Sequence, residues 1–171
     1  LDITIWAMPV QRVYNPNARR MAELMQSDLA QIGVSARIVS YEWNTFRRRL
    51  SRGEHDTVLI GWYADNADPD NFFRPLLSCA AVATGGNRAN WCHTGFDQLL
   101  YSAIATTNPE ERKALYQSAQ HLLNQQQPLL PIAHSKRFQA QQKSISGVEL
   151  PPYGGINFRL ATKKPVQEQS Q

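Results

Sequence analysis

The chain has 171 residues, of which 42% are hydrophobic and 19% charged, so it can bury one ordinary core. No apolar run approaches the roughly 18 residues of a membrane-spanning helix, so we expect a chain that does not span a membrane. The net charge of +4 is mild. Its only basic cluster, Arg47 to Arg52, favours a solvated helix face, with a nucleic-acid or membrane-surface module as the alternative.

The first 62 residues alternate between strand-like and helical patterns. Leu1 to Trp6 lack a Met and signal-peptide features, so we expect a portion of a longer chain that opens on a strand. Asn15 is the expected cap of the first helix, with Pro16 at its first position. The expected order is strand 3–8, helix 16–33, strand 34–39, helix 42–52 and strand 57–62. This alternation predicts an α/β layer with crossover connections.

Helical patterns dominate the next part of the chain. They predict one helix after Asp68-Pro69, a second around 96–104 and a third that begins at Asn108-Pro109. A buried strand is expected over 129–133. We expect residues 1–135 to form one compact lobe, 136–162 to form a crossover segment, and 163–171 to be a disordered tail.

Two cysteines, Cys79 and Cys92, flank a stretch with loop composition. A disulfide closing this loop would suit an oxidising compartment. Free buried thiols and a metal site are the alternatives. A metal site is disfavoured because Cys92-His93 and the distant His55 do not supply four ligands at short spacing.

Three carboxylates lie between the third strand and the next helix. Asp68 precedes Pro69 and an apolar helical run, which predicts a helix cap. Asp70 falls in the first turn, where a surface charge suits the helix dipole. Asp65 caps nothing obvious and follows a strand end, so it is either an exposed turn residue or part of a ligand crevice. A calcium loop is rejected because Asp70 and Leu76 stand where glycine and glutamate are needed.

A second strand-to-helix junction carries Arg12. Arg12 is either a loop arginine or an anion site that faces the same crevice as Asp65. Together, a guanidinium and a carboxylate would suit a zwitterion such as a short peptide, which spans roughly 7 Å as a dipeptide. A hydrolase that uses Asp65 and Asp68 is a rival, although no nucleophile or base motif supports it.

Several motifs together resemble one known family. They are Met8-Pro9, Arg12, Tyr14 and Pro16, then Gly61-Trp62, Asp65 and Asp68-Pro69-Asp70-Asn71-Phe72-Phe73, then Leu77-Ser78-Cys79 and Trp91-Cys92. Over residues 1–155 the chain resembles the peptide-binding proteins of bacterial ABC importers, solute-binding protein family 5. It is most similar to the dipeptide-binding and Sap-type branch.

The resemblance implies an α/β fold: the second, C-terminal lobe of a two-lobe periplasmic binding protein, with a mixed sheet flanked by helices. It places the peptide amine on Asp65, the peptide carboxylate on Arg12 and a disulfide between Cys79 and Cys92. Trp62, Tyr63 and Tyr14 are candidate walls for ligand side chains, or else packing residues.

The family also implies capture rather than catalysis, with no cofactor, metal or nucleic acid. The expected location is the periplasm of a Gram-negative bacterium, and the expected partner is the membrane permease of an ABC importer. Sap-type members bring antimicrobial peptides, haem or polyamines as alternative ligands to short peptides.

Overall fold

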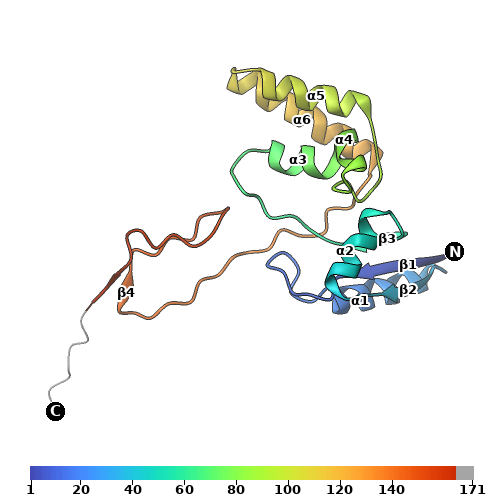
Figure 1. The fold of residues 1–171 in the computed structure, drawn as a ribbon, viewed down its shortest axis with the longest axis horizontal. Helices are drawn as coiled ribbons and strands as arrows, with labels where there is room; N and C mark the ends of the chain where they lie inside the picture. Colours follow the sequence, from blue (N-terminus) through green and yellow to red (C-terminus); the bar gives the residue numbers. More distant parts are fainter. Residues whose placement is uncertain (165–171) are drawn as a thin grey trace, which may run out of the picture.

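The computed structural model describes residues 1–164 as two packed units followed by a long extended segment (Figure 1). The sheet unit comprises β1 (Asp2–Ala7), α1 (Ala18–Gln31), β2 (Ser35–Val39), α2 (Trp43–Ser51) and β3 (Thr57–Leu59). The helical unit comprises α3 (Asp70–Leu77), α4 (Cys79–Ala83), α5 (Thr94–Ala105) and α6 (Pro109–Gln126). The extended segment ends in a ribbon of β4 (Ile145–Ser146) and β5 (Thr162–Lys163).

The sheet is three-stranded and parallel, in the order β2-β1-β3. Ile5, Trp6 and Ala7 are all buried, and successive strand residues face opposite sides, so β1 is covered on both faces. The predicted α/β fold is confirmed. The sheet itself is parallel rather than mixed, because the antiparallel strands β4 and β5 form a separate ribbon.

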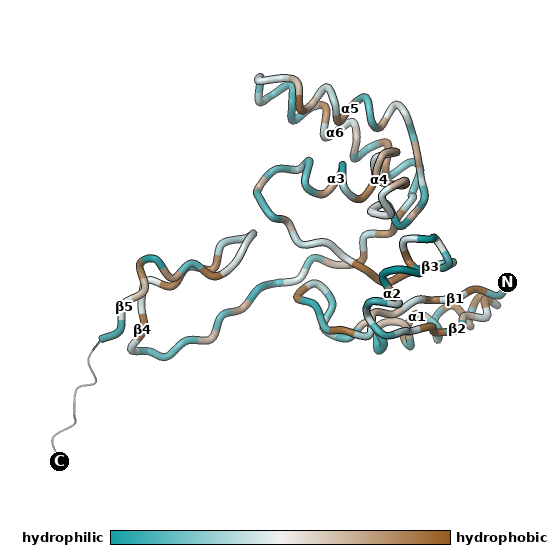
Figure 2. Tube along the Cα trace, in the orientation of Figure 1, coloured by the Kyte–Doolittle hydropathy of each residue, from teal (hydrophilic) through white to brown (hydrophobic). Residues whose placement is uncertain are grey.

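Each unit has its own hydrophobic core. Hydrophobic residues occur along the elements of both units (Figure 2). In the sheet unit, Trp6 lies 5.7 Å from Phe46 of α2, measured between ring centroids. In the helical unit, Phe73 of α3 stacks on Tyr116 of α6 at 5.6 Å, and Phe96 of α5 is fully buried. The apolar stripes of α3, α5 and α6 therefore face one another, as their helical spacing predicts.

A disulfide loop joins the two units. Cys79 and Cys92 are bonded, with Cα atoms 4.5 Å apart, which confirms the predicted pairing. Within the loop, buried Asn87 donates to the Trp91 carbonyl at 2.7 Å. The Nε2 atom of His55, between α2 and β3, lies 2.8 Å from the Arg88 carbonyl oxygen, so the loop rests against the sheet unit.

The first helix begins later than predicted. Asn17, not Asn15, is its cap, and the Asn17 side chain accepts from the Arg20 amide at 2.9 Å. Paired backbone hydrogen bonds of 3.1 and 3.0 Å join Arg12 and Asn15 in a tight turn. This turn occupies the residues that the helix would need, and Asn15 is buried within it.

Two predicted strands differ from the structure because strands need neighbours. β3 ends at Leu59 rather than at residue 62, since Leu59 pairs with Ala7, the last residue of β1. Residues 129–133 form no strand, and Leu130 is 75% exposed. Within residues 1–164, no other strand lies beside this stretch to accept its backbone hydrogen bonds.

The C-terminal ribbon extends the ordered chain slightly beyond the predicted crossover. Lys163 pairs with Ile145, and the Lys164 amide donates to the Ser144 carbonyl at 2.8 Å. The first two residues of the predicted tail are therefore paired, and 165–171 lie outside the described residues. Over residues 1–164, no helix combines the length and apolar character needed to cross a membrane.

Candidate functional site

The predicted site residues follow two neighbouring strands of the sheet. Arg12 and Tyr14 come after β1, while Trp62, Tyr63 and Asp65 come after β3. β1 and β3 pair in parallel, so both loops leave the sheet at the same, carboxyl edge. Ligand crevices of open α/β sheets lie outside this edge.

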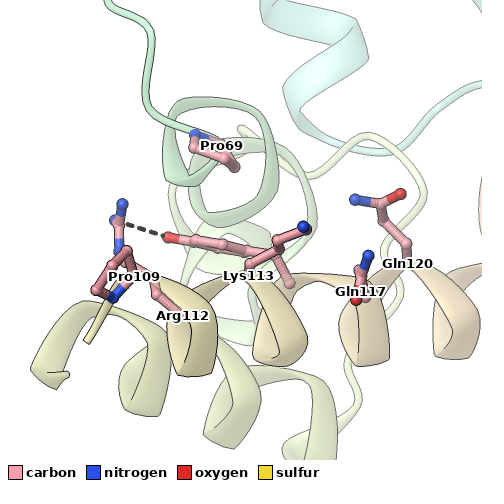
Figure 3. Close-up of a pocket in the computed structure, with 7 residues that line it drawn as sticks. Pro69, Pro109, Arg112, Lys113, Gln117 and Gln120 are labelled. Carbon is pink, nitrogen blue, oxygen red and sulfur yellow. Dashed lines mark hydrogen bonds between the residues drawn. The ribbon is translucent and has the colours of Figure 1, made fainter. Parts of the chain in front are cut away.

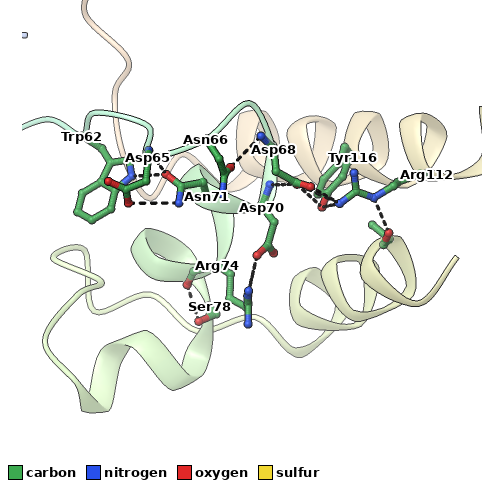
Figure 4. Close-up of polar contacts among 11 residues, drawn as sticks. Trp62, Asp65, Asn66, Asp68, Asp70, Asn71, Arg74, Ser78, Arg112 and Tyr116 are labelled. Carbon is green, nitrogen blue, oxygen red and sulfur yellow. Dashed lines mark hydrogen bonds and ion pairs between the residues drawn. The ribbon is translucent and has the colours of Figure 1, made fainter. Parts of the chain in front are cut away.

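Asp65 is exposed, and its backbone is held by a residue that the sequence did not single out (Figure 4). The Oδ1 atom of Asn71, in α3, accepts from the Asp65 amide at 3.0 Å and from Trp62 Nε1 at 3.1 Å. The Asn71 Nδ2 atom lies 3.5 Å from the Asp65 carboxylate. Among residues 1–164, Asp65 has no ion-pair partner, so its carboxylate keeps most of its accepting capacity.

Asp68 is occupied by protein groups. Its carboxylate accepts from the Asp70 amide at 2.9 Å, in the first turn of α3, and pairs with Arg112 of α6 at 2.8 Å. Burial favours the neutral acid, but the Asp70 amide and the Arg112 guanidinium outweigh burial and lower the pKa of Asp68. The predicted cap is wrong by one position, because α3 begins at Asp70 and Pro69 is its cap residue; Asp68 lies one residue earlier, bonds the first turn of α3 through the Asp70 amide, and ties α3 to α6.

The sequence predicts a surface charge at Asp70, but the structure buries this residue. It is 8% exposed and pairs with Arg74, one helical turn later, at 2.6 Å. Its Oδ1 atom is buried without a hydrogen-bond partner among the described residues. Asp70 therefore stabilises α3 internally and is not available to a ligand.

We expect Asp68→Asn to lower the free energy of unfolding by about 1–2 kcal/mol at pH 7. The substitution weakens the hydrogen bond from the Asp70 amide and removes the partly screened ion pair with Arg112. The lowered pKa means that this contribution is present above the unfolded value near pH 4 and is lost as the pH falls through the folded value. Denaturant unfolding from pH 3 to 7 should show wild type and variant converging in acid. A constant gap across this range would contradict the assignment.

Arg12 lies beside an aromatic side chain from the segment that follows β2. Its guanidinium stands 4.8 Å from the ring centroid of Trp43, the first residue of α2, and donates to the Gln11 carbonyl at 3.3 Å. Arg12 has no acidic partner among the described residues. A stacked guanidinium keeps its in-plane donors available for an anion.

Tyr14 connects the β1 and β3 loops. A Cβ atom added to Gly61 would lie 2.5 Å from the Tyr14 ring, so only glycine allows this approach. Burial raises the pKa of Tyr14, and the neighbouring Arg12 only partly offsets that effect. Tyr14 therefore packs between the loops that carry Arg12 and Asp65.

The two aromatic residues after β3 have different surroundings. Trp62 is 38% exposed and bonds Asn71, so it lies beside Asp65. Tyr63 instead donates its hydroxyl hydrogen to the Gly154 carbonyl and lies 5.1 Å from the Arg137 guanidinium. Tyr63 thus contacts the segment that follows α6.

Two surface grooves lie away from these residues. One, of about 430 Å³, runs along α6 beside Pro69 and is lined by Arg112, Lys113 and Gln117 (Figure 3). The other lies on the β4–β5 ribbon. Neither is lined by Asp65 or Arg12. Over residues 1–164, no three His, Cys, Asp or Glu side chains gather as metal ligands would.

Three contributing residues escaped sequence reasoning. Asn71 was placed in an apolar helical run, although its amide side chain beside Asp70 was a signal for local hydrogen bonding. Arg112 lies 44 residues from Asp68, and nothing in the sequence links them. Trp43 is the first residue of α2, and nothing in the sequence links it to Arg12.

A parallel α/β unit whose adjacent strands are followed by a carboxylate and a guanidinium, neither of them ion-paired within residues 1–164, is suited to binding a ligand. Residues 7–84 match the middle part of the bacterial extracellular solute-binding proteins, family 5. With the relatives described below, this match makes the chain similar to a portion of a family 5 solute-binding protein.

The chain is similar to peptide-binding proteins along nearly its whole length. It is 49% identical to the dipeptide-binding protein of Escherichia coli, over 92% of this chain and 29% of the relative. It is 39% identical to the peptide transport periplasmic protein SapA of Salmonella typhimurium, over 98% and 31%.

Solved structures agree with these relatives. A dipeptide-binding protein from Pseudoalteromonas in complex with Met-Leu is 56% identical, with a TM-score of 0.85, over 95% of this chain and 32% of that protein. HbpA2 from Haemophilus parasuis is 38% identical, with a TM-score of 0.85, over 96% and 32%. The predicted family and two-lobe fold class are confirmed, and the chain spans about 30% of the length of these relatives.

Proposed function

We propose that the whole protein captures dipeptides, with Asp65 holding the α-ammonium and Arg12 the carboxylate. The observation that carries the proposal is the Asp65 carboxylate, which has no ion-pair partner within residues 1–164 and lies in the loop after β3, next to the strand whose loop carries Arg12. Fixed opposite charges at one sheet edge match a zwitterionic ligand.

The order of the strands supports a short ligand. Arg12 follows β1 and Asp65 follows β3, and these two strands pair directly in the sheet. An extended dipeptide spans roughly 7 Å, a length that side chains from two neighbouring loops can bracket. Trp62 beside Asp65 and Tyr14 between the loops are the candidate walls for ligand side chains.

The contacts of the Asp65 and Asp68 carboxylates favour capture of a ligand over catalysis. A paired-acid hydrolase would need Asp65 and Asp68 to act together on a substrate. Asp68 is bonded to Arg112 and to the Asp70 amide, so it is not free to share a proton with Asp65. The Arg47–Arg52 alternative is weakened because Arg49 pairs with Glu54 and stacks on Tyr41.

The relatives favour a dipeptide ligand over the Sap-type alternatives. Identity is 49% to a dipeptide-binding protein and 56% to the protein in complex with Met-Leu, against 39% to SapA. A periplasmic location in a Gram-negative bacterium and delivery to the permease of an ABC importer follow as parts of the proposal. The Cys79–Cys92 disulfide suits that oxidising compartment.

The division of the chain belongs to the same proposal. Residues 1–135 act as the ligand-binding lobe and 136–162 as a crossover to a first lobe. The exposed apolar side chains of the extended segment support this division, because isolated apolar surface of this kind usually packs on a partner. Phe138 is 87% and Phe158 62% exposed. Tyr63 joins this segment to the Asp65 loop through Gly154.

Titration calorimetry of the whole protein with Met-Leu tests the function. We expect one peptide bound per protein and intact Met-Leu after prolonged incubation, as shown by mass spectrometry. Binding should carry a negative heat-capacity change, because closure buries apolar surface. Release of free methionine and leucine would contradict capture, and an absence of binding would contradict the ligand class.

A further inference from the structure

We propose that Asn71 is a positioning residue for amine recognition, which holds the Asp65 loop in the shape that receives the ligand's ammonium group. This inference rests on the proposed function of Asp65. It assigns to Asn71 a role in selectivity that differs from stabilising its own helix.

The geometry of the Asn71 amide carries the proposal. Its Oδ1 atom accepts two N–H donors, the Asp65 amide at 3.0 Å and Trp62 Nε1 at 3.1 Å (Figure 4). Both donors need an oxygen, so only one orientation of the amide satisfies them. One side chain thus fixes both the backbone of Asp65 and the indole ring three residues earlier.

The carboxylate of Asp65 is left comparatively free. The Asn71 Nδ2 atom lies 3.5 Å from Asp65 Oδ2, which is long for a hydrogen bond. Asn71 therefore holds the Asp65 backbone closely and its side chain loosely. This combination suits a charge acceptor, because a carboxylate saturated by protein donors would offer less to an ammonium ion.

The helix turn that carries Asn71 is itself ordered. Asn71 lies in the first turn of α3, where its backbone amide donates to the Asp68 carbonyl at 3.1 Å and the Phe72 backbone amide donates to the Pro69 carbonyl at 3.0 Å. α3 packs on the helical core through Phe73 and Leu77. The Asp65 loop has no regular structure of its own, and its hydrogen bonds to Asn71 fix its position relative to a packed helix.

A measurement of selectivity for a free amine distinguishes a positioning role of Asn71 from a role in protein stability alone. The measurement is the ratio of dissociation constants for N-acetyl-Met-Leu and Met-Leu, by calorimetry on the whole protein. In Asn71→Ala we expect this ratio to fall roughly 10- to 100-fold, as for two lost positioning hydrogen bonds. Alanine suits a helix, so the fold should persist.

Asn87→Ala is the matched control. Asn87 is buried, its amide bonds the disulfide loop, and it contacts none of the site residues, so its loss should lower stability and leave the ratio unchanged. The inference is overturned if Asn71→Ala keeps wild-type selectivity, or if Asn87→Ala loses as much selectivity as Asn71→Ala. Asp65→Asn distinguishes a failure of the proposed function from a failure of the inference about Asn71. If that variant keeps selectivity, the proposed function fails, and the inference with it. If it loses selectivity while Asn71→Ala does not, only the inference fails.

Discussion

Replacing Asp65 with asparagine is expected to weaken Met-Leu binding to the whole protein by roughly 100-fold to several thousand-fold. An ammonium group enclosed by closing lobes would lose its counter-charge, and removing one partner of a desolvated pair typically costs about 3–5 kcal/mol. The substitution keeps the size of the side chain and the backbone bond to Asn71, so the loop should hold its shape. Calorimetry gives the affinity, and thermal unfolding should show a nearly unchanged midpoint because Asp65 is exposed.

Asp68→Asn provides the control for this result, since it changes the same functional group three residues away. Its carboxylate serves Arg112 and the Asp70 amide, so its loss should reduce stability and leave affinity for Met-Leu close to wild type. If Asp65→Asn binds Met-Leu like the wild type, the assignment of the amine site to Asp65 is wrong. If the two variants exchange roles, Asp68 is the binding residue.

Removing the disulfide is expected to lower the free energy of unfolding by roughly 2–4 kcal/mol. A cross-link over this loop restricts the unfolded chain, and loops of about 15 residues correspond to about 3 kcal/mol on the chain-entropy model. The loop also joins the sheet unit to the helical unit through His55 and Arg88. The measurement is denaturant unfolding of the Cys79→Ser, Cys92→Ser double variant of the whole protein.

Reduction of the wild type supplies an independent comparison. Wild type treated with dithiothreitol should unfold at the denaturant concentration of the double variant, and further dithiothreitol should not affect the variant. Affinity for Met-Leu should change little below the unfolding transition, because the loop does not contact Asp65 or Arg12. Equal stability of oxidised wild type and double variant would show that the bond contributes nothing to the folded state.

The elements that could be predicted are those with local causes. Apolar residues at helical spacing are enough to place α5 and α6, and the Asn108-Pro109 start coincides with the cap and first residue of α6. Alternation of strands and helices is enough to give the α/β class. The family's motifs led to the disulfide as well, and the resemblance covered most of the chain.

The features that could not be predicted depend on partners distant in sequence. The end of β3 is set by the length of β1, and residues 129–133 lack a neighbouring strand in the described chain. The pairing of Asp68 with Arg112 requires α6 to lie beside the first turn of α3, which no local pattern specifies. Asp70 is buried for the same reason, since the packing of α3 decides its exposure.

The separation of the two hydrophobic cores has a consequence for the order of folding. The residues of the first core all come before position 60, and those of the second all come after position 72, so each core is built from one continuous stretch of the chain. A core of this kind can form without the other stretch, because units with their own core generally fold separately. The loop that carries Asp65 belongs to neither core: it follows β3 of the sheet unit and is hydrogen-bonded to Asn71 of α3 in the helical unit. Its shape is therefore completed only after both cores exist, which makes the binding loop one of the last parts of the chain to assemble.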